Sequence, residues 1–134
     1  MPVSLSLGTV RTPEFSVATG WYWIMVQVEK PLPFQQMECM MGVTTSPLDS
    51  KDCSIHYPLL RADWKVLEQG HPVSSGSSTT KADAKFTEQY IFKFLGSFGA
   101  EAGKKYVLEV KFTKDGTPLN VAHPHLIIVK QGEE

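Results

Sequence analysis

The sequence of 134 residues has no excess of charge of either sign and no long apolar run. Its 13 Lys and Arg residues are balanced by 14 Asp and Glu residues, which gives a formal net charge of -1. A balance this close to neutral gives no electrostatic reason to expect a nucleic acid or an anionic membrane as partner. No apolar stretch reaches the roughly 18 residues that a membrane-spanning helix needs, so no transmembrane segment is predicted.

The motifs of common enzyme and metal sites are also missing. There is no Gly-x-Ser-x-Gly elbow for a nucleophilic serine, and no His-Glu-x-x-His or Cys-x-x-Cys motif for a metal. His123 and His125 are close in sequence, and His56 and His71 would have to join them through the fold to hold zinc. We therefore expect surface histidines, no cofactor, no metal and no catalytic residue. A metal-dependent or hydrolytic enzyme built around the histidines is the third-ranked alternative.

Cysteine is scarce, with Cys39 and Cys53 as the two examples. A disulfide across the polar, loop-like residues 40–52 would remove about 3 kcal/mol of unfolded-state entropy. An even cysteine count around such a loop suits an oxidising compartment, so we expect a Cys39–Cys53 disulfide. The alternative is two unrelated free thiols.

The N-terminal residues lack the basic start and the continuous apolar run of a signal peptide. Two interpretations stay open. The protein is cytosolic, or the sequence is a mature segment from which a signal has been removed.

Alternation of apolar and polar residues is the dominant pattern of the chain. Within residues 105–113, the apolar positions Tyr106, Leu108, Val110 and Phe112 fall on one face. Lysine and glutamate occupy most of the other face, which is typical of a strand with one buried and one solvated side.

Residues 21–29 are rich in aromatic and β-branched side chains, which favours a strand over a helix. One face of this strand suits a core throughout, with Tyr22, Ile24, Val26 and Val28. The opposite face carries Trp21, Trp23 and Met25 and becomes polar toward its end. Side by side, the two tryptophans could stack a sugar ring or dock a protein, so this is the candidate binding face. The alternative is that a loop or the edge of the chain covers them.

Shorter extended segments are predicted at 3–7, 13–17, 37–43, 63–69, 86–98 and 125–130. In the fourth of these, Trp64 and Val66 should face inward. Residues 74–82 are rich in Ser, Gly and Thr and predict a mobile loop, and a helix competes only at 80–90. About eight short strands predict one all-β domain over residues 1–134, an antiparallel β-sandwich that is immunoglobulin-like or jelly-roll-like. A closed barrel is the main rival.

Several segments in the last two thirds of the chain carry a resemblance. They are Trp64-Lys-Val-Leu-Glu-Gln-Gly70, Ile91-Phe-Lys-Phe-Leu-Gly-Ser-Phe98, Gly103-Lys-Lys-Tyr-Val-Leu-Glu-Val110 and Pro124-His-Leu-Ile-Ile-Val129. With them the chain resembles small exported bacterial β-sandwich proteins of unassigned function, often lipoproteins or periplasmic proteins. The resemblance implies a periplasmic or outer-envelope location and an intact Cys39–Cys53 bridge, with a cytoplasmic location as the alternative. It carries no catalytic residues.

The function expected from the sequence is that of a non-catalytic envelope protein that binds another protein. Strand edges, the Trp21/Trp23 face or the Cys39–Cys53 loop would form the binding surface. Neutralisation of a toxin, as by an immunity protein, is one version of this function. A carbohydrate-binding module that uses Trp21, Trp23 and Tyr57 is the second hypothesis. Exposed edge strands would also allow a dimer, but the sequence fixes no oligomeric state.

Overall fold

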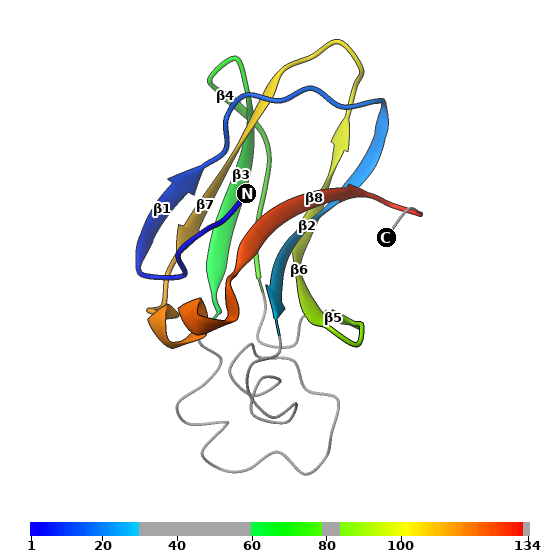
Figure 1. Cartoon of the computed structure of the whole chain (residues 1–134). Coiled ribbons are helices and arrows are strands. Elements are labelled where there is room, and N and C mark those ends of the chain that lie inside the picture. The colour runs from blue at the N-terminus through cyan, green and yellow to red at the C-terminus, as the bar shows by residue number, and fades with distance from the viewer. Residues whose placement is uncertain (30–59, 79–83, 133–134) are drawn as a thin grey trace.

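The computed structural model describes residues 1–29, 60–78 and 84–132, and these residues form eight strands and one short 3-10 helix. The elements are β1 (Gly8–Arg11), β2 (Gly20–Glu29), β3 (Ala62–Glu68), β4 (His71–Ser77), β5 (Ala84–Phe86), β6 (Tyr90–Ala100), β7 (Tyr106–Phe112), η1 (Thr117–Ala122) and β8 (His125–Lys130). Sheet I has the strand order β1-β7-β3-β4, and sheet II has the order β5-β6-β2-β8. Neighbouring strands are antiparallel, and Figure 1 shows the sheets as two layers. The predicted antiparallel all-β sandwich is confirmed.

The core lies between the two sheets and follows the alternation of the sequence. In β7, Leu108 and Val110 are fully buried, and in β2 Ile24, Val26 and Val28 are fully buried. Their neighbours along each strand point outward because successive side chains of a strand alternate between its faces. Each large apolar side chain that leaves water in this way contributes roughly 1.5–3 kcal/mol to folding. The inward faces predicted for both strands are confirmed.

Trp64 of β3 closes one side of the sandwich. Its indole N–H donates to the carbonyl oxygen of Leu95 on β6, at 3.0 Å, so one side chain links the two sheets. The ring passes between Gly76 of β4 and Gly96 of β6, where an added Cβ would lie within 3.0 Å of ring atoms. The inward orientation predicted for Trp64 and Val66 is confirmed, since both are buried.

The N-terminal segment differs from its expected strand at 3–7. Residues 3–7 form no strand, and β1 begins at Gly8. Leu5 is buried although it is not part of a strand. Its N–H donates to Asn120 Oδ1 at 2.9 Å, and its carbonyl oxygen accepts from the N–H of Gly116 at 2.8 Å. These bonds hold Leu5 next to η1 in place of a strand ladder, while Leu7 is exposed.

The Ser/Gly/Thr-rich segment predicted as a loop at 74–82 begins instead as a strand. Residues 74–77 belong to β4, which pairs with β3 along its length. Backbone hydrogen bonds hold residues 74–77 in this edge strand although none of them has an apolar side chain, and the small residue Gly76 leaves room for Trp64. Residues 79–83 and the strand predicted at 37–43 lie outside the described residues. The chain enters β5 at Ala84, so residues 84–86 are extended and not helical.

Candidate functional site

The outer side of sheet II gathers apolar and aromatic side chains from three neighbouring strands. β2 supplies Trp21, Trp23 and Met25, as the sequence predicted. In register, Met25 is paired with Phe94 of β6 and Ile127 of β8, and Trp23 with Val129 of β8. We call this surface the aromatic face, and its members are Trp21, Trp23, Met25, Tyr90, Phe92, Phe94, Ile127 and Val129.

Ring contacts fix the side chains of the aromatic face. The rings of Trp23 and Phe94 lie 4.8 Å apart between centroids at an interplanar angle of 36°. Those of Tyr90 and Phe92 lie 6.1 Å apart at 53°. Contacts of this kind contribute about 0.5–1.5 kcal/mol beyond the area that they bury. These two pairs of rings are therefore packed against each other before any partner binds.

The three predicted members of the binding face differ in exposure. Trp21 is 61% exposed, Trp23 is half-buried, and Met25 is only 2% exposed. Met25 is flanked in register by Phe94 and Ile127, so it supports the face and does not offer surface to a partner. The structure thus places the accessible part of the predicted site at the tryptophans.

Trp21 lies flat on the sheet. A Cβ added at the facing residue, Gly99, would sit 3.6 to 3.7 Å from three atoms of the indole, which is ordinary van der Waals distance. Nearly equal distances to three ring atoms indicate that one face of the ring covers the backbone at Gly99. The other face of the ring is directed to solvent.

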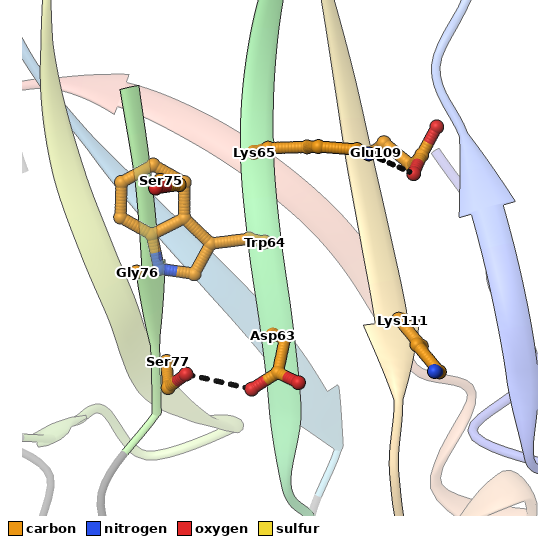
Figure 2. A pocket seen from close by; sticks show the side chains of 8 residues that line it. All are labelled: Asp63, Trp64, Lys65, Ser75, Gly76, Ser77, Glu109 and Lys111. Atoms are coloured by element: carbon orange, nitrogen blue, oxygen red, sulfur yellow. Dashed lines mark hydrogen bonds and ion pairs between the residues drawn. The ribbon is translucent and has the colours of Figure 1, made fainter. Parts of the chain in front are cut away.

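The outer side of sheet I is polar and holds a shallow depression of about 310 Å³ (Figure 2). Glu109 at its border is bound by Arg11 at 2.6 Å and by Lys65 at 3.3 Å. The Arg11 hydrogen bond is the main reason why the pKa of Glu109 is lowered. Asp63 accepts a hydrogen bond of 2.6 Å from the Ser77 hydroxyl. Both carboxylates are therefore engaged by neighbouring side chains, which indicates a structural role for this cluster.

Lys93 is an unexpected inward-facing residue on β6. It is fully buried, and its ammonium group donates to the carbonyl oxygen of Leu60 at 3.1 Å. Burial, aided by the positive charge of Arg61, lowers its pKa to about 8. A lysine in this state is a reactive amine when it faces a substrate cavity. The hydrogen bond of its ammonium group to the backbone carbonyl of Leu60 indicates a structural role for Lys93.

The described histidines, His71, His123 and His125, do not gather at one site. His123 ends η1 with φ of 51°, and its Nδ1 lies 2.8 Å from Glu29 Oε2. His125 Nδ1 donates to the carbonyl oxygen of His123 at 2.9 Å, while His71 is on β4 of the other sheet. Over residues 1–29, 60–78 and 84–132, no group of three His, Cys, Asp or Glu residues could hold a metal.

Other predicted residues cannot be placed. His56, Cys39, Cys53 and Tyr57 lie outside the described residues, so the predicted disulfide stays a prediction. In the part of the chain that the structure describes, no helix is long and apolar enough to cross a membrane.

The sequence pattern alone does not show that the aromatic face continues from β2 onto β6. In the sequence, Tyr90, Phe92 and Phe94 alternate with Ile91 and Lys93, but this pattern does not assign the aromatic set to the outside of the sheet. What assigns these residues to the outside is the pairing of β6 with β2, because the outward side chains of two paired strands lie on the same side of the sheet.

Comparison with protein-family models, with curated proteins and with solved structures found no match to this chain.

Proposed function

We propose that this protein is a non-catalytic binding domain, that its partner is another protein, and that the aromatic face is the binding surface. The exposure of Trp21 carries this proposal. Trp21 is 61% exposed on the outward side of β2, and Trp23, the next outward residue of that strand, contacts Phe94 and pairs with Val129. Such a surface loses unfavourable contact with water when a partner covers it.

The construction of the face suits a protein partner. Tryptophan and tyrosine are enriched among the residues that dominate protein–protein binding energy, because they bury large areas with few rotatable bonds. Polar groups lie at the border, where Glu29 pairs with His123 at 2.8 Å. An apolar centre with a polar border is the usual anatomy of a protein interface.

The cellular setting is part of the same proposal. The resemblance to small exported bacterial sandwiches and the predicted Cys39–Cys53 bridge support a periplasmic or outer-envelope location, with the cytoplasm as the alternative. Neutralisation of a toxin is the version of the function that the resemblance supports. The aromatic face would then cover a surface that the toxin needs for its own activity.

A comparison of two surface variants tests the protein-binding role. Trp21→Ser removes the exposed indole, and Val73→Ser is the matched control because Val73 is 50% exposed on β4 of the opposite sheet. Both immobilised variants and the wild type are incubated with an extract of the cells that encode the protein. We expect one stoichiometric partner on the wild type and on Val73→Ser, and its loss on Trp21→Ser. Equal retention by all three, or no partner at all, would contradict the proposal.

A carbohydrate-binding module is the second candidate, favoured by the orientation of Trp21. An indole that lies flat on the sheet with its other face open has the geometry for stacking on the C–H groups of a sugar ring. A glycan array separates the candidates. A glycan that binds the wild type and Val73→Ser but not Trp21→Ser would replace the protein partner, whereas silence across a broad array would remove this candidate.

A further inference from the structure

Strand β8 is an edge strand of sheet II, and the N-terminal residues cover only its beginning. Pro2 and His125 form an antiparallel bridge. Next to it, the N–H of Leu126 donates to the carbonyl oxygen of Met1 at 2.8 Å, and the N–H of Val3 donates to Pro124 at 3.0 Å. Residues 1–3 thus pair with the start of this edge in the way that an added antiparallel strand would.

The rest of the edge carries backbone groups that point away from β2. The N–H of Gln131 donates to the carbonyl of Trp21 at 2.9 Å, and the β2–β8 register pairs Lys130 with Tyr22. Because inward and outward hydrogen bonding alternates along an antiparallel strand, the odd-numbered residues of β8 bond to β2. The N–H and C=O groups of Ile128 and Lys130 are therefore directed to the open side, like those of Leu126. No strand among the described residues pairs with them there.

A cleft of about 480 Å³ lies next to this open edge. Its lining residues are Met1, Thr12, Pro13, Glu14, Phe15, Leu126, Ile127 and Ile128, which are mostly apolar. Phe15 is held in place by two backbone hydrogen bonds to Tyr106, each 2.8 Å long. The cleft is therefore bounded by the edge of sheet II on one side and by a fixed segment that pairs with sheet I on the other.

We propose that the protein partner binds by adding an extended segment as a further strand of sheet II, antiparallel to β8 and opposite Ile128 and Lys130. The inference rests on the proposed function and specifies how the partner is held. Unpaired N–H and C=O groups at strand spacing recognise the backbone of a β-strand, and the pairing direction continues that of residues 1–3. Alternate side chains of the added strand would enter the cleft, which selects an apolar residue. The remaining side chains would extend the aromatic face beyond Ile127 and Val129.

A second copy of this chain fits the edge less well than a different polypeptide. If Ile128 paired with Ile128 of another copy, Lys130 would meet Leu126, whose open side is already taken by Met1. A shift by two residues removes that clash but places Lys130 opposite Ile128, on the side of the apolar cleft. A charged lysine in that position is poorly matched to the apolar cleft, so the occupant that fits the edge is an extended segment of another protein.

Selection from a library of random peptides displayed on phage tests the proposal with a defined probe. The full-length chain is the target, and Lys130→Pro is used for counter-selection, because proline lacks the N–H that the added strand needs. The substitution leaves the odd-numbered bonds to β2 in place, and thermal unfolding checks that the variant folds. We expect peptides that bind the wild type at least about tenfold more tightly than Lys130→Pro and bind Val73→Ser as well as the wild type.

Hydrogen exchange on the wild type gives a readout that needs no variant. In the free protein, the amides of Ile128 and Lys130 should exchange faster than those of Ile127 and Val129, which bond to β2. A selected synthetic peptide should slow exchange at Ile128 and Lys130 by about tenfold or more. Protection confined to other strands, or no peptide that distinguishes Lys130→Pro, would overturn the proposal. Self-association that Lys130→Pro abolishes would also overturn it, because the occupant would then be a second copy.

Capture of the cellular partner by Trp21→Ser and by Lys130→Pro tests the aromatic face and strand addition separately. If Trp21→Ser loses the captured partner and Lys130→Pro keeps it, the aromatic face binds the partner and strand addition is wrong. If both variants lose it, both conclusions are supported. If neither variant loses it, both fail.

Discussion

The indole ring of Trp64 lies so close to the α-carbon of Gly96 that a methyl group at that position would overlap it. The same ring donates a hydrogen bond to Leu95, the preceding residue on β6. One side chain of sheet I thereby satisfies a backbone carbonyl of sheet II and fills the gap between β4 and β6. This contact joins the two sheets on the side of the sandwich opposite β8, which is an edge strand of sheet II.

Gly96→Ala should destabilise the protein because the new methyl group must displace the indole or the β6 backbone. We expect a loss of roughly 1–3 kcal/mol in the free energy of unfolding, measured by urea denaturation. Gly99→Ala is the matched control on the same strand, since a Cβ there meets Trp21 at an ordinary distance of 3.6 Å. It should change the stability by less than about 0.5 kcal/mol. Equal effects of the two substitutions would contradict the packing described for Trp64.

Trp64→Phe should cost about 1–3 kcal/mol, because the Leu95 carbonyl loses its buried partner and the smaller ring leaves a void. The smaller ring also leaves more room at residue 96. In the double variant, Gly96→Ala should therefore cost less than it does in the wild type. A double-mutant cycle of unfolding free energies measures this coupling, and strictly additive effects would show that the two residues do not share the site.

Lys93 should make the free energy of unfolding rise with pH between about pH 8 and pH 10.5. Its pKa is about 8 in the folded protein and ordinarily 10.5, so between these values the unfolded chain binds a proton that the folded chain does not. The free energy of unfolding therefore increases from pH 8 to 10.5, by up to about 3 kcal/mol. Below pH 8 both states carry the charge, and the folded state bears the cost of burying it.

Urea denaturation of the wild type and of Lys93→Met at several pH values checks this prediction. The wild-type stability should rise across the range, and the rise should be absent from the variant, whatever the variant's absolute stability. Parallel pH profiles would show that Lys93 is not the titrating group.

Arg11 should control the acid titration of Glu109. The Arg11 hydrogen bond is the largest cause of the lowered pKa of Glu109, so Arg11→Gln should raise that pKa toward its ordinary value. In the wild type, the stabilising contribution of ionised Glu109 is present above its unfolded pKa and is lost as the pH falls through its folded pKa. An NMR titration of the carboxylate measures the change. Lys105→Gln, which removes an ion pair with Glu14, should leave it unaltered.

The predicted Cys39–Cys53 disulfide has a direct test in the mass of the intact protein. Reduction should add about 2 Da if the bridge is present, which would support an oxidising compartment. An unchanged mass, with both thiols open to alkylation before reduction, would favour the cytoplasmic alternative.

Simple alternation was enough to predict the strands that have one buried side. In β7 the inward and outward sets differ clearly in polarity, and in β2 one set stays apolar while the other ends in Gln27 and Glu29, so the inward faces of both strands were assigned correctly. In β6 both sets are mainly apolar, and the inward direction of Lys93 depends on partners distant in sequence. Residues 74–77 form a strand through backbone pairing at a sheet edge, which leaves no apolar pattern to detect. Leu5 is placed by the hydrogen bond that its N–H donates to the Asn120 side chain, a contact that no local pattern encodes.

The three indole N–H signals of the 15N-labelled protein test the central claim most directly. Trp21 and Trp23 lie on the aromatic face, whereas the N–H of Trp64 is buried against the Leu95 carbonyl. When the captured partner is added, the signals of Trp21 and Trp23 should shift or broaden while that of Trp64 stays in place. Unchanged signals of Trp21 and Trp23, with shifts confined to the amides of Asp63, Lys65 and Glu109 on sheet I, would contradict the assignment of the aromatic face as the binding surface.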